Sequence, residues 1–351
     1  MSSLDQFFSE PNFFTKPLFD QLKNHPKRIV FPEGEDIRVL RVASKFVEQE
    51  LGVPILLGNR ERIFEMAEQE GLSMQFVRVI DPERSSDLDL FCQRLERIER
   101  YRGLTGVDAS AMIAKPHFFA AMMVQYGQAD AVLGGNQMSP AGVFRPLLHL
   151  IKPDAKVPHV FAVNVLTSNK LPHFGKEGVL FLGDTGLIPE PSVEDLAAIA
   201  VETGMLAHHH LGRRVRVALL SHSNLGSSPT ESARKMQAAT ALARERVLDD
   251  DCIIDGEIQL DVALDPEAAE VKLPSMTRKD VADVLIFPSL DAAHIAFKLL
   301  CLTGEVQPYG RIIRGLTRPS GQVPMTASEE MILGTAAALG VEAIQYRELY
   351  E

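Results

Sequence analysis

The stretch that decides the fold reads RIVFPEGEDIRVLRVASKFVEQE and spans residues 28–50. It begins with a short apolar run at residues 28–31 and continues through an acidic turn that contains proline and glycine. Apolar side chains then recur at helical spacing over residues 37–49, and a second apolar run follows at residues 54–58. A strand, a helix and a strand in this order predict a parallel βαβ unit.

The same alternation continues along the chain. Apolar runs predict further strands at residues 77–80, 129–133, 157–165, 178–182, 215–220, 253–257, 284–287 and 311–315. Between them, helical spacing predicts helices at residues 61–70, 87–102, 116–126, 192–211, 229–246, 290–302 and 328–339. This pattern indicates an α/β protein, and the length of 351 residues indicates two domains.

The composition excludes several classes of function. The chain is 46% hydrophobic and carries a net charge of −11, so it can bury a full core and has no electrostatic reason to bind nucleic acid or a membrane. Its three cysteines, Cys92, Cys252 and Cys301, are far apart, which favours a reducing cytosol over disulfides or a zinc site. With no membrane-length apolar run and no secretory signal, we expect a cytoplasmic protein.

Ligands of α/β proteins bind beyond the carboxyl ends of the strands, and one such end is rich in hydroxyl groups. Residues 221–228, which read SHSNLGSS, follow a predicted strand and open a predicted helix. A helix N-terminus offers N–H groups and a partial positive charge to a phosphate or acyl oxygen. An ordinary capped turn remains the alternative. The residues expected to bind substrate here are Ser221, Ser223, Asn224, Gly226, Ser227 and Ser228.

A second strand end reads GGNQMSP at residues 134–140. Paired glycines allow a close approach to the backbone, and Asn136 and Arg145 are the side chains expected to bind substrate. Arg145 can offer two parallel hydrogen bonds to a phosphate or carboxylate. The alternative for Arg145 is an ordinary surface ion pair.

A third strand end, DGEIQLD at residues 255–261, is acidic. Asp255 and Glu257 could orient an arginine or act as a general base, and Asp184 ends another strand in the same way. A solvated acidic turn is the alternative. The chain has no phosphate-binding loop of the nucleotide type and no Gly-x-Gly-x-x-Gly after a strand, so a nucleotide-dependent dehydrogenase is not favoured.

Taken together, these segments resemble the phosphate acetyl/butyryltransferase family. The matching motifs are RIVFPEGED at residues 28–36, PILLGN at 54–59, FRP at 144–146, PSVED at 191–195, the 217–223 strand end, IDGEIQLD at 254–261 and FPSL at 287–290. The resemblance implies two α/β domains with largely parallel sheets and an interdomain cleft, a fold shared with isocitrate and isopropylmalate dehydrogenases. It implies a discontinuous domain, residues 1–152 plus 312–351, into which residues 153–311 are inserted, and a homodimer or higher oligomer.

The resemblance also implies the reaction. Acetyl-CoA and phosphate are exchanged for CoA and acetyl phosphate, by direct attack of the CoA thiolate in a ternary complex. No cofactor and no metal are expected, and coenzyme A or acetyl-CoA is a substrate or ligand. The strand end GLTRP at residues 315–319 matches the family and gives Arg318 as a further phosphate-side residue.

The chain departs from the family after that strand end. Pro324 and Met325 stand where the family has its catalytic serine and arginine, and Met331 stands in place of its aspartate base. Leu302 and Glu99 fall near two further arginine positions of the family. If the chain is an enzyme, the residues expected to stand in for the missing groups are Thr326, Ser328, Glu329 and Glu330.

A second hypothesis follows from these losses. KPLF at residues 16–19 and LLSHSN at 219–224 are similar to the phosphotransacetylase-like C-terminal domain of bacterial NADP-malic enzymes, which resembles a non-catalytic acetyl-CoA sensor. The alternative to a phosphate acyltransferase is therefore a regulatory protein that binds acyl-CoA without turning it over. An activity assay separates the two.

Overall fold

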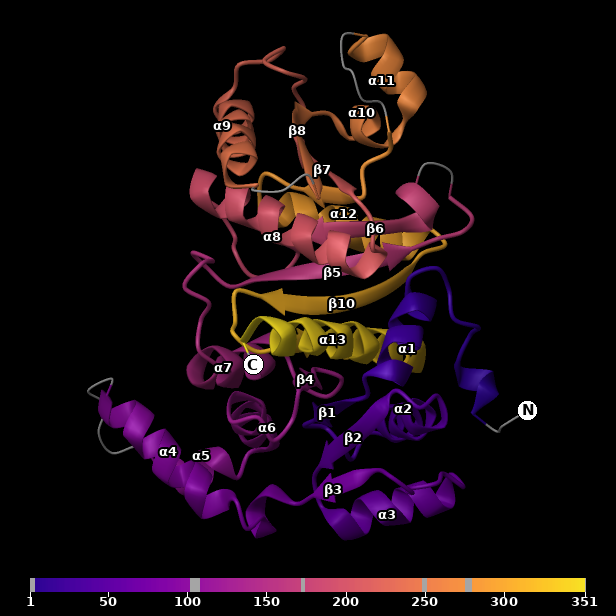
Figure 1. Ribbon diagram of the computed structural model, residues 1–351, viewed down its shortest axis with the longest axis vertical. Helices are drawn as coiled ribbons and strands as arrows, with labels where there is room; N and C mark the ends of the chain where they lie inside the picture. Colours follow the sequence, from indigo (N-terminus) through magenta and orange to yellow (C-terminus); the bar gives the residue numbers. More distant parts are fainter. Residues whose placement is uncertain (1–3, 102–107, 172–173, 248–250, 275–279, 351) are drawn as a thin grey trace. The chain divides into compact units, whose positions relative to one another are not determined.

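The computed structural model describes residues 4–101, 108–171, 174–247, 251–274 and 280–350 (Figure 1). The chain divides into two compact units. The first unit comprises Met1–Pro11, Thr15–Asp154 and Leu316–Glu351, and the second comprises Asn12–Phe14 and Ala155–Gly315. Each unit has its own strands, helices and core.

The strands of the first unit follow the order β3-β2-β1-β4-β11 and are all parallel. The apolar runs of the inner strands β1 and β4 are buried on both faces, as is typical of parallel sheets. Val30 packs in a cluster with side chains of α4, α6 and α7, and alternation along the strand turns Ile29 and Phe31 to the other face. The strands are β1 (Lys27–Phe31), β2 (Gly52–Leu57), β3 (Arg78–Ile80), β4 (Ala131–Gly134) and β11 (Ser320–Gln322).

Helices cover this sheet, and two that pack against each other, α1 and α13, come from distant parts of the chain. The last helix, α13, packs against α1 and α2 and against β1, β4 and β11, so segments far apart in sequence lie side by side (Figure 1). The helices of the unit are α1 (Thr15–Asn24), α2 (Ile37–Glu48), α3 (Arg60–Gln69), α4 (Leu88–Tyr101), α5 (Ala109–Ile113), α6 (Pro116–Gln125), α7 (Pro140–Leu150) and α13 (Glu329–Tyr350), with 3₁₀ turns at Asp5–Phe7 and Pro82–Arg84.

The second unit has the strand order β10-β5-β6-β9-β7-β8. Strands β6, β9, β7 and β8 are parallel, whereas β5 runs antiparallel to both β6 and β10. The strands are β5 (Phe161–Thr167), β6 (Val179–Gly183), β7 (Val215–Leu220), β8 (Cys252–Ile258), β9 (Val284–Ile286) and β10 (Gln307–Arg314). The helices are α8 (Val193–Leu211), α9 (Glu231–Arg246), α10 (Leu260–Leu264), α11 (Pro266–Lys272) and α12 (Leu290–Thr303), with a 3₁₀ turn at Lys176–Gly178.

The predicted α/β class with largely parallel sheets is confirmed. The strand predicted at residues 215–220 is β7, and the helix predicted from residue 192 is α8, whose N-cap Ser192 forms a capping box with Asp195. The helix predicted to end at residue 339 is longer, because the apolar pattern of α13 continues through residues 340–344. None of the described helices combines the length and apolarity needed to cross a membrane.

Residues Asn12–Phe14 belong to the second unit although both flanking segments belong to the first. The Phe14 ring is 1% exposed and packs against Phe181, His210 and Tyr309, and Asn12 Nδ2 donates a hydrogen bond of 2.8 Å to the Tyr309 hydroxyl. Phe13 is 72% exposed. The Phe14 ring therefore belongs to the core of the second unit, and the ring of the adjacent Phe13 does not.

Replacing Phe14 by alanine should lower the free energy of unfolding by about 3–5 kcal/mol, because it removes a buried ring and leaves a cavity. Urea unfolding followed by circular dichroism would measure the loss. Phe13→Ala is the matched control and should change stability by less than about 0.5 kcal/mol. Equal stability of the two variants would contradict this account of Asn12–Phe14.

Candidate active site

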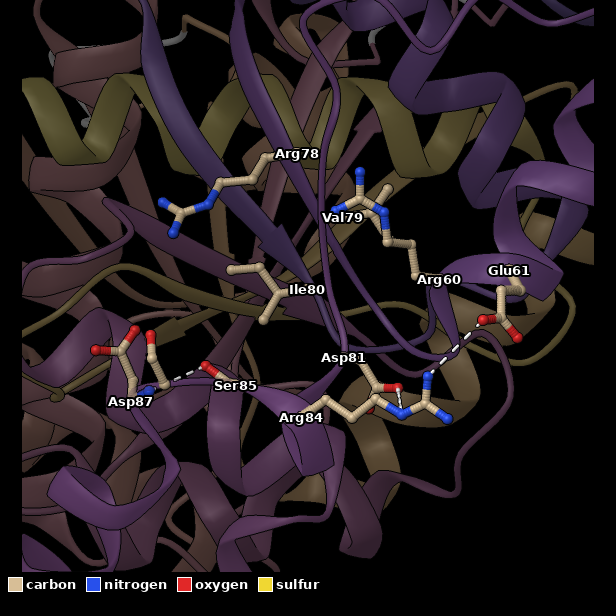
Figure 2. Close-up of a pocket in the computed structure, with 10 residues that line it drawn as sticks. Arg60, Glu61, Arg78, Val79, Ile80, Asp81, Arg84, Ser85 and Asp87 are labelled. Atoms are coloured by element: carbon tan, nitrogen blue, oxygen red, sulfur yellow. Dashed lines mark hydrogen bonds and ion pairs between the residues drawn. The ribbon is translucent and has the colours of Figure 1, made fainter.

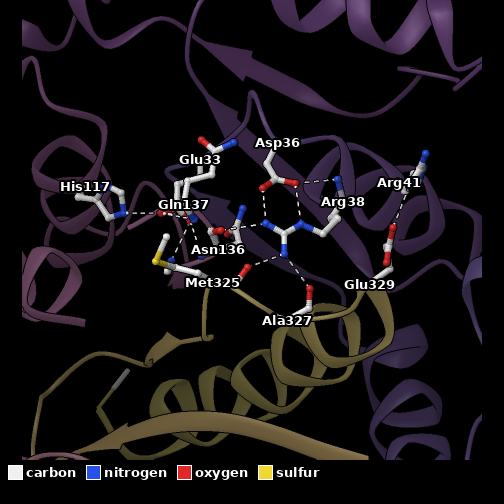
Figure 3. Close-up of polar contacts among 11 residues, drawn as sticks. Glu33, Asp36, Arg38, Arg41, His117, Asn136, Gln137, Met325, Ala327 and Glu329 are labelled. Atoms are coloured by element: carbon white, nitrogen blue, oxygen red, sulfur yellow. Dashed lines mark hydrogen bonds and ion pairs between the residues drawn. The ribbon is translucent and has the colours of Figure 1, made fainter. Parts of the chain in front are cut away.

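In the first unit, a buried glutamate organises the strand ends. Glu33 follows β1, and its Oε2 accepts hydrogen bonds from the backbone N–H groups of Gly135 and Asn136 at 2.8 and 2.9 Å, while Oε1 accepts one from Gln137 at 3.2 Å (Figure 3). His117 Nε2 lies 3.3 Å from Oε1. The N–H groups after β4 are thus turned toward a carboxylate of the protein itself.

Gly135 can adopt this conformation only because it has no side chain. Its φ is +118°, and a Cβ there would lie 2.2 Å from the Val323 carbonyl oxygen. The close backbone approach expected for the paired glycines is present, and the group approached is the chain leading out of β11. Asn136 is buried within the same turn.

Arg38 joins three segments of the first unit. Its guanidinium pairs with both oxygens of Asp36, at 3.1 and 2.7 Å, and donates to the carbonyl oxygens of Met325, Ala327 and Asn136, each at 2.9 Å (Figure 3). Burial alone raises the pKa of the Asp36 carboxyl, but hydrogen bonds with Arg38 and Asn136, together with the charge of Arg38, outweigh burial and hold its pKa below the ordinary 3.8. Arg38 therefore fixes the backbone around Thr326.

The four residues predicted to be catalytic lie together between β11 and the first turn of α13. Thr326 is exposed, and Ser328 Oγ accepts a hydrogen bond of 3.2 Å from the Met331 N–H. Glu329 pairs with Arg41 Nη1 at 3.0 Å, and Glu330 accepts a hydrogen bond of 3.0 Å from the Ser9 hydroxyl. The carboxylates are thus oriented by neighbours, while Thr326 is an exposed residue.

The remaining predicted residues of the first unit differ in exposure. Arg145 is exposed on α7, and Arg318 is half-buried just before β11. Met325 is 58% exposed, and Glu99 is buried on α4 with His149 Nε2 2.6 Å from its carboxylate. Arg145 is thus exposed to solvent, whereas Glu99 contacts a histidine within the unit.

In the second unit, Glu257 performs the same task as Glu33. It is 1% exposed, and its Oε1 accepts hydrogen bonds from Ser223 Oγ at 2.9 Å and from the Gly226 N–H at 2.6 Å. Its carbonyl oxygen accepts from the Leu225 N–H at 3.0 Å. Glu257 therefore fixes the loop after β7 through these three hydrogen bonds, and its carboxylate is shielded from solvent.

The rest of the 221–228 loop is closed by its own hydrogen bonds. Ser221 Oγ accepts from the Ser223 N–H, Ser227 Oγ from the Asn224 N–H, and Ser223 Oγ from the Ser228 N–H, all within 3.1 Å. Asn224 Oδ1 accepts from the Gln259 N–H at 2.7 Å. The N–H groups of Ser223, Asn224, Gly226 and Ser228 thus serve the loop itself. Substrate contact by the residues of this loop stays a prediction.

Asp184 closes a third loop. Its carboxylate accepts hydrogen bonds from the N–H groups of Ala162, Gly186, Leu187 and Ile188, at 2.7–3.1 Å. Burial raises the pKa of Asp184, and these four donors oppose that shift.

Arg311, which the sequence analysis does not single out, lies against this Asp184 loop. A Cβ on Gly186 would come within 2.7 Å of its Nε. Burial lowers the pKa of Arg311, and the charge of Asp184 opposes that shift.

Asp255 lies two residues from Glu257 in β8 but pairs elsewhere. Arg216 Nε, on the neighbouring strand β7, donates to Asp255 Oδ2 at 2.6 Å. Arg216 is 3% exposed and also donates to the Ala263 and Asp280 carbonyl oxygens. In this arrangement, Asp255 neutralises a buried arginine.

A pocket of about 340 Å³ lies beside β3 and is lined also by the start of α3 and the turn after β3 (Figure 2). It contains none of the predicted site residues, and its charges balance. Arg84 lies 3.8 Å from both Glu61 and Asp81. We therefore assign it no part in the chemistry; its charged lining residues are Arg60, Arg78, Arg84, Glu61, Asp81 and Asp87.

Sequence reasoning missed Glu33 and Arg38 as organising residues. Both lie in the acidic turn and helix start after the first predicted strand, where the strand-end rule directs attention. Among the described residues, no group of three or more His, Cys, Asp or Glu side chains could hold a metal ion. Arg145 and the 221–228 loop lie in different units, so joint binding of one ligand stays a prediction.

Comparison with known proteins decides the family. Residues 13–339 match the family described as phosphate acetyl/butaryl transferase. The chain belongs to this family. It is 32% identical over 332 residues to the phosphate acetyltransferase of Acetivibrio thermocellus, a match that covers 94% of this chain and 98% of that protein.

Two further comparisons show which other proteins this chain is similar to. The EutD phosphotransacetylase of Staphylococcus aureus has a similar structure, with a TM-score of 0.83, 29% identity, and coverage of 94% of this chain and 98% of that one. The NADP-dependent malic enzyme of Escherichia coli is 33% identical over 349 residues, which is 98% of this chain but 44% of the enzyme. The predicted resemblance to both groups is confirmed.

Asp36→Asn should lower the free energy of unfolding at neutral pH by about 1.5–3 kcal/mol, because Arg38 loses a charged partner. Since the folded-state pKa of Asp36 lies below 3.8, the stability that its carboxylate provides is present above that value and is lost as pH falls through the folded-state pKa. The difference between wild type and variant should therefore shrink between about pH 5 and about pH 3 in chemical denaturation. A difference that stays constant over this range would contradict the ion pair.

Proposed function

We propose that this chain is an enzyme, a phosphate acyltransferase that interconverts acetyl-CoA plus phosphate with CoA plus acetyl phosphate. The observation that carries the proposal is the family match over residues 13–339, together with close similarity to phosphate acetyltransferases along almost their full length. The substrates are then an acyl-CoA and phosphate, or CoA and an acyl phosphate.

The reaction needs a thiolate, an electrophilic carbonyl and a stabilised leaving group. In the direction of acetyl-CoA synthesis, the CoA sulfur forms a bond to the acyl carbon, the bond from that carbon to the phosphate oxygen breaks, and phosphate leaves with the electron pair. The thiol proton passes to a base. A thiol with a pKa near 8.5 is mostly protonated at pH 7, which costs about 2 kcal/mol.

The first unit supplies candidate groups for these tasks. Glu329 and Glu330 are the candidate bases, and Thr326 and Ser328 are candidate donors to the developing oxyanion. Arg145 is the candidate cation for the phosphoryl oxygens. Arg38 positions the segment around Thr326 through its bonds to Met325 and Ala327.

An assay of CoA-dependent acetyl phosphate consumption tests the proposal. Arg145→Ala should reduce kcat/KM by about tenfold to a hundredfold, because a charge-assisted contact is lost. Thr326→Ala should lower kcat, and Ser328→Asn, which keeps an acceptor for the Met331 N–H, should do the same.

Arg97→Ala, which changes an exposed arginine of α4, is the control and should leave the rate unchanged. A wild-type rate no higher than that of a blank without protein would remove the enzyme hypothesis, whereas equal, measurable rates of wild type and Arg145→Ala would remove only the role of Arg145. Acetyl-CoA binding without turnover would then establish the regulatory alternative.

We propose that the enzyme acts in the cytoplasm and works as a homodimer. Cys92, Cys252 and Cys301 form no disulfide with one another, which fits a reducing compartment, and cell fractionation would test this location. Helix α12 supports the dimer, because Ile295, Leu299 and Leu302 recur at helical spacing and are 65%, 58% and 83% exposed. An apolar helix face of this kind is costly in water, and a second copy of the chain would cover it.

Leu299→Asp should convert the dimer to a monomer in sedimentation velocity, because a charge would be buried at the apolar face. Val271→Asp is the control, since Val271 on α11 is 81% exposed and should leave the mass unchanged. A monomeric wild type, or a dimeric Leu299→Asp variant, would refute this interface.

A further inference from the structure

Leu225 is held in a backbone conformation that leucine rarely adopts. Its φ is +46°, in the left-handed region, and its side chain is 52% exposed. A bulky residue there is a genuine outlier, and such outliers cluster at functional sites. The conformation is enforced by Glu257, whose carbonyl and carboxylate oxygens accept from the N–H groups of Leu225 and Gly226.

A second exposed leucine follows the neighbouring strand β8. Leu260 opens α10 and is 49% exposed. The hydrogen bond from the Gln259 N–H to Asn224 Oδ1 joins the two residues that precede Leu260 and Leu225. Both leucines therefore lie at the carboxyl-end edge of the parallel strands β7 and β8, where α/β proteins bind ligands. We call Leu225 and Leu260 the rim leucines.

Backbone N–H groups at this edge are already hydrogen-bonded within the protein. The N–H groups of the loop serve Glu257 and the serine hydroxyls, and Lys272 on α11 is bonded to Asp261 and Gln259. An uncharged, partly apolar chain would find two leucine side chains at this edge. An exposed leucine needs no explanation by itself, but one kept in a strained conformation at a ligand-binding edge does.

We propose that the rim leucines contact the pantetheine arm of coenzyme A, making them specificity-determining residues of the second unit. The arm is uncharged and carries methylene and methyl groups that leucine side chains can shield from water. The inference rests on the proposed acyltransferase function, because that function supplies the CoA substrate.

Leu225→Asn separates contact from stability. Asparagine tolerates the left-handed region, so the melting temperature should be equal to or higher than that of wild type. Loss of the apolar contact should raise KM for CoA about fivefold, with kcat and KM for acetyl phosphate unchanged. Leu260→Ala should also raise KM for CoA. With dephospho-CoA as substrate, the ratio of the Leu225→Asn KM to the wild-type KM should be the same as with CoA.

Phe76→Asn is the matched control. Phe76 also has a positive φ, +64°, and is 71% exposed, but it precedes β3 at the opposite end of the strands of the first unit. It should leave both KM values unchanged. A variant that shifts KM for acetyl phosphate instead would assign Leu225 to the acyl group and overturn the proposal, as would unchanged values for Leu225→Asn.

Calorimetric titration with CoA distinguishes this inference from the proposed function. If wild type binds CoA but does not turn over, the acyltransferase proposal fails, and a weaker Kd of Leu225→Asn would still support the contact. If wild type turns over and Leu225→Asn binds CoA as tightly, only the contact fails. Absence of both binding and turnover would overturn both.

Discussion

The capture of backbone N–H groups by buried carboxylates is the constraint on which both units depend. Glu33, Asp184 and Glu257 each lie at a strand end, and each accepts hydrogen bonds from the loop beside it. A carboxylate buried without such donors would cost several kcal/mol, so the donors and the acid stabilise each other. The loops that could meet a substrate are therefore rigid before any substrate arrives.

This arrangement decides which groups remain for an anionic substrate. Backbone N–H groups at three strand ends are occupied by the protein's own negative charges, in a chain whose net charge is already −11. Side-chain cations on the surface, such as Arg145 in the first unit, must then provide the attraction. Fixed geometry and a few exposed cations favour selective binding over general affinity for anions.

The sequence predicted the elements well because their signals are local. The apolar run of β7 and the Ser192 cap of α8 are decided by neighbours in sequence. The hydrogen-bond partners of the acidic residues at the strand ends could not be predicted in this way. Asp255 and Glu257 lie two residues apart, yet their partners differ. Asp255 accepts a hydrogen bond from Arg216 on the adjacent strand, and Glu257 accepts one from Ser223 in the loop after β7. Such partners come from pairing between distant segments, and the left-handed conformation of Leu225 depends on the same long-range bonds.

The discontinuity of the first unit bears on how the protein is made. Strand β11 and helix α13 complete its sheet and cover it, and they belong to Leu316–Glu351, a segment that is synthesised after the second unit. Apart from Asn12–Phe14, the second unit is one continuous segment and can close while translation is still under way. Until α13 has been synthesised, the apolar side chains of β1 and β4 that it covers stay exposed. Exposed apolar surface of this kind makes a nascent chain prone to aggregation and a target for chaperones.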